Sequence, residues 1–421
     1  MPHFTLYDAP ERNISVPKTA AQAAIEETFS FDGPPDAMIT IAGKVYLYFA
    51  GSGYLGLQAN PEVLAATCES VLHYGVGTAT SRTAFTSPPV FEVERRIAEM
   101  FGTEHALYTA SGYAANLMML ESLEKTFDRI FIDEASHYSL FESAKRIRKK
   151  RCIPITFRHR DTDDLKKKLD ANLQLHERPI VLTDGVFAQH GTAAPLNEYT
   201  VLLAGYAGAS LWVDDAHGFG ILGNTGRGTL EHFGLDASAV NQTPDDWNGD
   251  WETDDTVYSA AIPLYLTFSL SKAAGGCGGV IPGSAAFIQR LKDHSSVYFA
   301  ASAPPTPIAA ATAKSLAILA ESNLRQRLHK NVTLIKSKLR SIGLDIPDTL
   351  YSAALPAVIL TLGAAANMKR IQKELSQRGI LIAYLPRNIA LGSQGALRIA
   401  VFATHTEAMI TELVETLAKT L

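Results

Sequence analysis

Cysteines and long apolar runs are scarce in this sequence, and their scarcity excludes several classes of protein. The three cysteines, Cys68, Cys152 and Cys277, are far apart, with neither a CxxC pair nor a histidine spacing typical of zinc. No run of about 18 apolar residues occurs, and the first residues show no basic segment followed by an apolar one. We therefore expect no disulfide framework, no metal site and no membrane span, and the sequence predicts a cytoplasmic protein.

An excess of positive charge is also lacking. The chain has 38 Lys and Arg against 43 Asp and Glu, which gives a net charge of −5. Without a basic field, neither nucleic acid nor an anionic membrane is expected as a partner. The one basic run, residues 145–151, is typical of a solvated C-terminal helix turn, where cations complement the helix dipole.

Short apolar segments alternate with amphipathic ones along much of the chain. The apolar segments 105–110, 129–133 and 179–187 each precede a stretch with helical periodicity, and segment 210–217 repeats the strand pattern. Strands that alternate with helices are typical of a mostly parallel sheet covered on both faces. The sequence therefore predicts the α/β class.

The pattern also predicts how the chain is divided. Residues 1–55 are expected to form an N-terminal arm, and residues 56–295 a large domain that contains the parallel sheet. Two long helical segments followed by an alternating pattern predict a smaller C-terminal α+β domain at 296–421. The acidic, aperiodic stretch 236–256 is interpreted as a solvated surface insertion.

Segment 210–223 contains a G-x-G-x-x-G pattern after an apolar strand, as in a dinucleotide site. In such a site the glycines follow the strand directly, so that the backbone can touch a pyrophosphate. Here Asp214, Asp215 and His217 intervene, and two carboxylates would repel that anion. These three side chains therefore argue against a nicotinamide or flavin site and favour a site in which they contact the ligand themselves.

A carboxylate at a strand end, a histidine three residues later and a lysine in a serine-containing turn together indicate pyridoxal phosphate. This cofactor needs a buried anion beside its ring nitrogen and is held as a Schiff base on a lysine. Asp214 is the candidate for the ring nitrogen, His217 for the phenolic oxygen and Lys272 for the aldehyde. The Ala and Gly residues at 273–279 are expected to let backbone approach the cofactor closely.

A phosphate site is expected where a strand leads into a helix. Ser111, Gly112 and Tyr113 lie at such a junction, where free N–H groups and the helix dipole bind anions. Ser269 and Ser271 would add hydroxyl groups. A serine-glycine turn alone is also an ordinary helix start, so the prediction depends on its combination with the other motifs.

Many motifs in order give the chain a family resemblance from about residue 45 onward. They are YLGL, FGTEHALYTASGYAAN, IFIDEASHYSL, VLTDGVFAQHGTAAPL, DDAHGFGILGNTGRG, the turn that contains Lys272, APP and LRIAVFATHT. In these motifs the chain resembles the α-oxoamine synthase family of fold type I pyridoxal-phosphate enzymes. The resemblance implies a large domain with a mostly parallel seven-stranded sheet, a smaller C-terminal domain and a homodimer.

The resemblance also assigns roles to individual residues. It makes Lys272 the Schiff-base lysine, Asp214 the partner of the ring nitrogen and His217 the partner of the phenolic oxygen. It makes His137 the imidazole stacked on the cofactor ring, a contact of about 1 kcal/mol. It makes Arg398 the clamp for the substrate α-carboxylate, which suits a planar guanidinium.

Each of three residues has a plainer alternative. His137 is also placed to cap the next helix together with Ser136. His217 has the alternative of a core histidine whose polar atoms are satisfied by backbone. Arg398 has the alternative of an edge-strand arginine that faces solvent.

The chain departs from the family pattern around the expected substrate. Gly53 stands where the family usually has Asn, and Ala188 where it commonly has Ser. Residues 86–89 replace a usual Gly-Asn-His, and Ala300 and Ala301 replace Ser-Thr. The cofactor motifs are kept, and the substrate-facing positions are altered.

The implied reaction is condensation of a small amino acid with an acyl thioester such as acyl-CoA, with decarboxylation, to give an α-amino ketone. An aminotransferase or a C–C lyase would use the same cofactor residues and break a different bond at the α-carbon. A nicotinamide oxidoreductase and an inactive scaffold are the other classes considered. The sequence leaves open the amino acid, the acyl chain and the choice between coenzyme A and a carrier protein.

Overall fold

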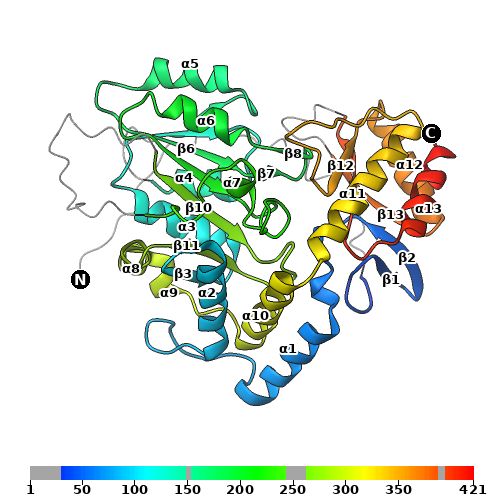
Figure 1. Ribbon diagram of the computed structural model, residues 1–421, viewed down its shortest axis with the longest axis horizontal. Helices are drawn as coiled ribbons and strands as arrows, with labels where there is room; N and C mark the ends of the chain where they lie inside the picture. Colours follow the sequence, from blue (N-terminus) through cyan, green and yellow to red (C-terminus); the bar gives the residue numbers. More distant parts are fainter. Residues whose placement is uncertain (1–29, 148–152, 243–261, 387–393) are drawn as a thin grey trace, which may run out of the picture.

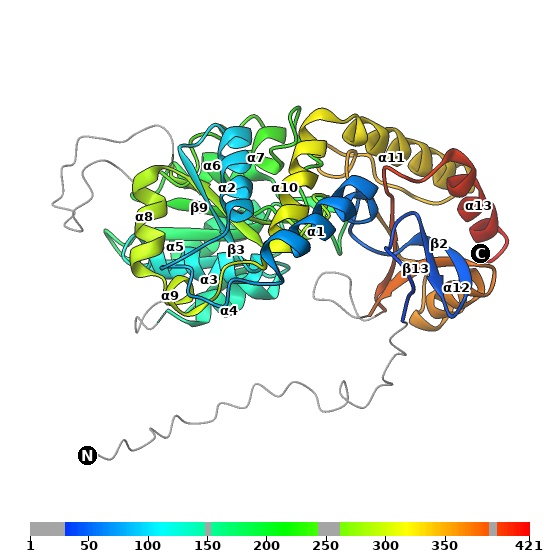
Figure 2. The same ribbon diagram turned by 90° about the horizontal axis from the view of Figure 1, so that it is seen from below.

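The computed structural model describes residues 30–147, 153–242, 262–386 and 394–421. Residues 1–29 of the expected arm, most of the basic run and residues 243–256 of the acidic stretch lie outside the described residues. Figures 1 and 2 show a larger body built around one sheet and a smaller body built around a second. Within the described residues, no helix is both long and apolar enough to cross a bilayer.

The larger body is built on a seven-stranded sheet, as predicted. Its strands, in spatial order, are β3 (His105–Thr109), β11 (Gly279–Gly283), β10 (Leu264–Ser269), β9 (Ser210–Asp214), β6 (Pro179–Asp184), β4 (Arg129–Asp133) and β5 (Ile155–Phe157). The pairs from β10 to β5 are parallel, and β11 runs antiparallel to both of its neighbours. All five residues of β9 are buried, as expected for a strand covered on both faces.

Helices cover both faces of this sheet. The side chains of β9 alternate between two apolar clusters, with Trp212 in one and Leu211 and Val213 in the other. The Trp212 cluster includes residues of α3 (Gly112–Leu123), α4 (Tyr138–Lys145) and α8 (Ala285–His294), which is followed by α9 (Ser296–Ala300). The other cluster includes residues of α2 (Pro88–Phe101), α5 (Thr162–Asn172), α6 (Leu196–Leu203) and α7 (Thr229–His232).

The smaller body contains a mixed five-stranded sheet. Its spatial order is β1 (Met38–Ile41), β2 (Lys44–Phe49), β13 (Ile380–Leu385), β14 (Ala396–Ala400) and β12 (Ala357–Leu360). Helices α11 (Leu324–Ser341), α12 (Ala365–Gln377) and α13 (Glu407–Ala418) belong to the same body (Figure 1). Because β2 pairs in parallel with β13, residues 38–49 share a sheet with the C-terminal part of the chain. The boundaries at residues 55 and 295 stay predictions.

The segment after β2 connects the two bodies. It leads through a short 3-10 helix (Leu57–Ala59) into α1 (Pro61–Tyr74), which packs on α10 (Thr306–Glu321). The backbone N–H of Ala403 donates to the carbonyl of Tyr54 at 2.7 Å. Gly275 packs against the backbone of Leu57 and Gln58. Residues 54–58 therefore contact both the small sheet and the turn that follows β10.

Candidate active site

Three of the predicted cofactor residues come together at the carboxyl ends of β9 and β10. These strands are adjacent and parallel, with Asp214 in register with Thr267. Asp214 ends β9, His217 lies in the turn that follows it, and Lys272 lies in the turn after β10. Ligands of open α/β sheets bind at this edge.

Asp214 is buried and is held by neutral donors. Its Oδ2 accepts from Asn116 Nδ2 at 2.6 Å, and its Oδ1 accepts from the N–H of Ala216 at 3.1 Å. Asn116 is fixed in turn by Thr267 Oγ1, which donates to its Oδ1 at 2.6 Å and accepts from Trp212 Nε1 at 3.1 Å. Burial raises the pKa of Asp214, and the bond from Asn116 opposes the rise. This carboxylate is rigidly oriented and lacks a cationic hydrogen-bond partner within the described residues.

A second carboxylate, Asp184, lies beside Asp214. It ends β6 and is in register with Asp214, and its Oδ1 accepts from the N–H of His137 at 3.0 Å. Burial and the neighbouring Asp214 raise the pKa of Asp184 well above its usual range. Asp184 was missing from the predicted site, although it ends an apolar strand just as Asp214 does. Two adjacent carboxyl groups, of which Asp214 is buried and Asp184 is partly exposed, favour a cation at this edge of the sheet.

Lys272 is half-buried in a tight turn. Burial lowers the pKa of its ammonium group, Asp214 opposes this effect, and the charge of Arg398 adds to it. The turn is closed by hydrogen bonds from the N–H of Gly275 to the carbonyl of Lys272 at 3.0 Å and from the N–H of Leu270 to the carbonyl of Gly278 at 2.9 Å. An amine whose pKa is lowered is unprotonated in a larger fraction of molecules near neutral pH, and only the unprotonated form can act as a base or a nucleophile.

The small residues after Lys272 are required by packing within the protein. A Cβ at Gly275 would collide with the backbone of Gln58, and one at Gly276 with the hydroxyl of Thr312. A Cβ at Gly279 would collide with the carbonyl of Ser111. Protein atoms therefore occupy the space of a Cβ at all three positions. The expectation that the Ala and Gly residues let backbone approach the cofactor closely stays a prediction.

Tyr54 links His217 to Arg398. Its hydroxyl lies 3.0 Å from His217 Nδ1 and accepts from Arg398 Nη2 at 3.1 Å. Burial lowers the pKa of His217 well below its usual value, and the charges of Lys272 and Arg398 lower it further. His217 is therefore neutral, and its Nδ1 is hydrogen-bonded to a side chain. The alternative of a core histidine whose polar atoms bond to backbone predicted a backbone partner instead. No sequence pattern marked Tyr54 for this role beyond its place in the YLGL motif.

Arg398 is buried, with 8% of its surface exposed. Its strand, β14, lies between β13 and β12, so the alternative of an edge-strand arginine facing solvent is wrong. Besides Tyr54, its guanidinium donates to the carbonyls of Ala188 at 3.1 Å and Gly51 at 3.0 Å. These three acceptors are neutral, and no acidic side chain of the described chain forms an ion pair with it. A buried charge without a counter-ion favours an anionic ligand.

His137 has an exposed side chain and caps α4. Its Nδ1 accepts from the N–H of Ser139 at 3.2 Å and lies 2.7 Å from Ser139 Oγ. The capping alternative is therefore correct for His137 itself, without a contribution from Ser136. The cap fixes the ring through Nδ1, and the backbone N–H fixes the same residue to Asp184. Its stacking role stays a prediction.

The residues predicted for a phosphate lie on two adjoining turns. Ser111 caps α3, its Oγ accepting from the N–H of Ala114 at 3.1 Å. Gly112 lies against Ser269, since a Cβ on Gly112 would be 3.0 Å from that of Ser269. The hydroxyls of Ser269 and Ser271 are 2.8 Å apart, and Tyr113 is exposed.

The G-x-G-x-x-G pattern has a structural explanation. A Cβ at Gly218 would collide with the carboxylate of Asp215, and one at Gly223 with that of Glu231. Asp215 is buried and accepts from the N–H of Thr229 at 2.6 Å, and burial raises the pKa of Asp215 to about 7. Gly218 and Gly223 therefore make room for carboxylates, which argues against a dinucleotide site.

At the positions where the sequence departs from the family pattern, the residues make contacts within the protein. Beside Gly53 lies the amide of Gln58, which donates to the carbonyl of Pro35 at 2.7 Å and occupies the space of a Cβ. Ala188 contributes its carbonyl to Arg398. Ser87 precedes α2 and accepts from Thr306 Oγ1 at 2.9 Å, and residues 300–301 end α9.

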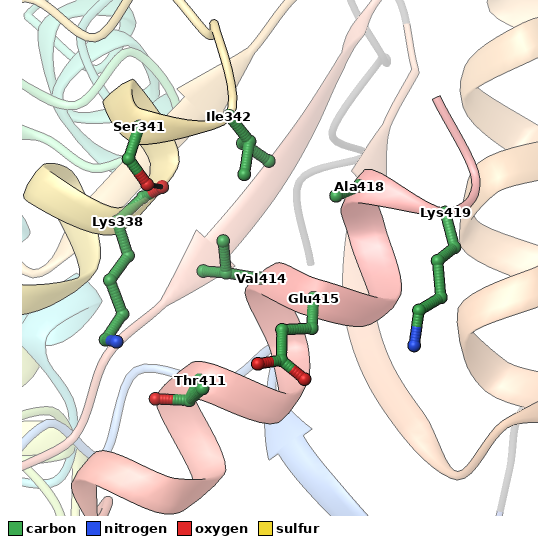
Figure 3. A pocket seen from close by; sticks show the side chains of 8 residues that line it. All are labelled: Lys338, Ser341, Ile342, Thr411, Val414, Glu415, Ala418 and Lys419. Carbon is green, nitrogen blue, oxygen red and sulfur yellow. Dashed lines mark hydrogen bonds between the residues drawn. The ribbon is translucent and has the colours of Figure 1, made fainter.

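A groove of about 430 Å³ lies elsewhere, between α11 and α13 (Figure 3). Its walls include Lys338, Glu415 and Lys419 around Ile342 and Val414. None of the predicted site residues lines it. We therefore place the candidate active site at the sheet edge.

The fold and this sheet-edge site define the class: the protein has the fold of the fold type I pyridoxal-phosphate enzymes. It is similar to a serine palmitoyltransferase variant from S. paucimobilis solved with a bound PLP–myriocin aldimine (TM-score 0.80, 23% identity, 93% of this chain and 92% of that chain). It is also similar to the serine palmitoyltransferase of Sphingomonas wittichii (TM-score 0.79, 25% identity, 93% and 92%).

The sequence comparisons give the family. The aminotransferase class I and II model matches residues 47–417. The 8-amino-7-oxononanoate synthase of Cellvibrio japonicus is 32% identical over 95% of this chain and 92% of that protein. The chain belongs to the aminotransferase class I and II family and, within it, to the α-oxoamine synthase group.

Proposed function

We propose that this protein is a pyridoxal-phosphate-dependent acyltransferase that condenses a small amino acid with an acyl thioester, with decarboxylation, to give an α-amino ketone. The observation that carries the proposal is Arg398, which is buried without an acidic partner among the described residues. Tyr54 links it by hydrogen bonds to His217, at the sheet edge where Lys272 also lies. A carboxylate of a substrate supplies the missing anion next to that edge.

The residues at the sheet edge fit the cofactor chemically. The buried carboxylate of Asp214, bonded to neutral donors, suits a protonated ring nitrogen, and Asp184 lies next to it in register across the sheet. The cofactor would be held covalently by Lys272, at its phenolic oxygen by His217 and on its ring face by His137. The phosphate would be held by Ser111, Gly112, Tyr113, Ser269 and Ser271. When bound, pyridoxal phosphate supplies an electron sink for negative charge at the substrate α-carbon.

The chain's own residues then divide the remaining work. Arg398 binds the substrate carboxylate and so fixes the orientation of the bonds at the α-carbon. Once the substrate amine has replaced it on the cofactor, Lys272, with its lowered pKa, would take a proton from that carbon at Nζ and later return it. Asp214 would pair with the protonated ring nitrogen of the bound cofactor.

The proposed function predicts that thiol release depends on an amino acid. The holoenzyme, supplied with acyl-CoA thioesters of different chain length, should release free coenzyme A only when a suitable amino acid is added. A thiol-reactive chromophore follows the reaction. An amine or keto acid formed from the amino acid with no thioester consumed would instead indicate an aminotransferase or a C–C lyase.

Assembly into a homodimer is part of the proposal. Helix α1, the segment after it and the start of α2 carry exposed apolar side chains, namely Leu64, Val71, Leu72, Tyr74, Val76, Phe85 and Phe91. Exposed apolar groups gathered over neighbouring segments are typical of an interface. A second copy related by a two-fold axis would cover them, and residues 299–305 would reach the phosphate of the neighbouring site.

We therefore predict a dimer by sedimentation velocity. The double variant Leu72→Glu with Phe85→Glu should sediment as a monomer and lose activity, because it places charge in the apolar interface. Leu175→Glu is the matched control, since Leu175 is 86% exposed, like Leu72 at 89%, and follows α5, which lies far from α1 in Figure 1. An active wild-type monomer would contradict the proposed assembly.

A further inference from the structure

A single hydroxyl joins the two bodies at the site. Tyr54 is 1% exposed, and its hydroxyl has one partner on each side. His217 Nδ1, 3.0 Å away, belongs to the turn after β9 of the large sheet. Arg398 Nη2, 3.1 Å away, belongs to β14 of the small sheet. The direction of these two hydrogen bonds can be worked out from the chemistry of the groups.

The guanidinium fixes the first bond. Arginine has donors and no acceptor, so the oxygen of Tyr54 accepts from Arg398. The hydroxyl proton of Tyr54 is then left for its other partner. Within the described residues that partner is His217 Nδ1, so Tyr54 donates to it.

This direction fixes the proton on the imidazole. A nitrogen that accepts a hydrogen bond carries no proton, and a neutral imidazole carries one proton on its other nitrogen. Burial and the nearby charges of Lys272 and Arg398 keep His217 neutral. Its proton therefore lies on Nε2. With the proton on Nδ1 instead, the hydroxyl proton of Tyr54 would be buried without an acceptor.

We propose that Tyr54 is a positioning residue that sets the Nε2–H tautomer of His217 and ties it to the carboxylate-binding Arg398. His217 then presents an N–H donor, rather than a lone pair, to the phenolic oxygen of the cofactor. This second half rests on the proposed function. The assignment of the tautomer depends only on the contacts of Tyr54. An experiment can therefore contradict the tautomer without contradicting the proposed function, and the reverse.

The tautomer can be read by nitrogen NMR. The full-length holoenzyme, labelled with ¹⁵N-histidine and sedimented for magic-angle spinning, is compared with the Tyr54→Phe variant, and His217→Gln assigns the signals. In the wild type, Nδ1 of His217 should appear unprotonated and Nε2 protonated. In Tyr54→Phe, both nitrogens should shift toward a mixture of tautomers. A protonated Nδ1 in the wild type would overturn the proposal even if the variant fails to fold.

A pH titration of the cofactor absorbance gives the second readout. An N–H donor stabilises the anionic phenolic oxygen, so its partial loss in Tyr54→Phe should move the midpoint to higher pH. Tyr48→Phe is the matched control, because Tyr48 also lies near Arg398 but its hydroxyl bonds to neither Arg398 nor His217. An unchanged midpoint in Tyr54→Phe, or an equal shift in Tyr48→Phe, would contradict the role of Tyr54.

Discussion

Replacing Lys272 by alanine is expected to abolish turnover and to remove the cofactor adduct that borohydride fixes on the wild-type protein. The residue lies in the turn after β10, beside Asp214, and its amine has a lowered pKa. Both features suit a lysine that forms a Schiff base and then exchanges protons with the substrate. Peptide mapping of the reduced wild-type protein should find the cofactor on Lys272.

Lys336 provides a control for this assignment. Burial lowers the pKa of Lys336 to about 8, and its ammonium donates to the carbonyls of Ser352 and Ala353, the latter at 3.0 Å. A lowered pKa alone therefore does not distinguish the two lysines. Lys336→Met should keep the adduct. A reduced peptide that carries the cofactor on Lys336, or on any lysine other than Lys272, would overturn the assignment.

Arg398→Ala is expected to weaken amino-acid binding by more than tenfold while the protein keeps its cofactor. A hydrogen bond to a charged group contributes roughly 1.5–3 kcal/mol, which corresponds to a factor of roughly 10 to 100 in the dissociation constant. Within the described residues, Arg398 is joined to His217 only through Tyr54, and it is not one of the predicted cofactor-binding residues. The cofactor should therefore stay bound in the variant. Equilibrium titration of the cofactor spectrum with amino acids measures the effect.

Two controls separate charge from packing in this experiment. Arg398→Lys keeps the charge but cannot donate to Ala188, Gly51 and Tyr54 together, so its binding should fall between those of the wild type and the alanine variant. Amines without a carboxylate should bind to all three proteins alike. Gly53→Asn is a poorer probe, because its side chain must displace Gln58. Normal amino-acid binding by Arg398→Ala would contradict the proposal that Arg398 binds the substrate carboxylate.

The sequence predicted local features better than long-range ones. The strand that ends at Asp214 and the helix that begins after Ser111 follow from apolar runs and capping residues within a few positions. The pairing of residues 47–49 with residues 380–382 depends on contacts between opposite ends of the chain. No periodicity marks such a pairing, so the segment was predicted only as part of an arm.

The site shows the same division. Asp184 ends a strand, but its importance depends on its register with Asp214 across the sheet. Tyr54 is separated by 163 residues from His217 and by 344 from Arg398, and its role depends on meeting both. The glycines of the G-x-G-x-x-G pattern resemble a nucleotide motif, although contacts with Asp215 and Glu231 require two of them, Gly218 and Gly223.

The most direct test of the proposed function follows the carboxyl carbon of the amino acid. The holoenzyme is incubated with an amino acid labelled with ¹³C at its carboxyl group, with and without an acyl thioester, and the products are analysed by mass spectrometry. We expect labelled carbon dioxide and an unlabelled α-amino ketone, both only when the thioester is present. Label that stays in a keto acid, or carbon dioxide released equally without the thioester, would contradict the account.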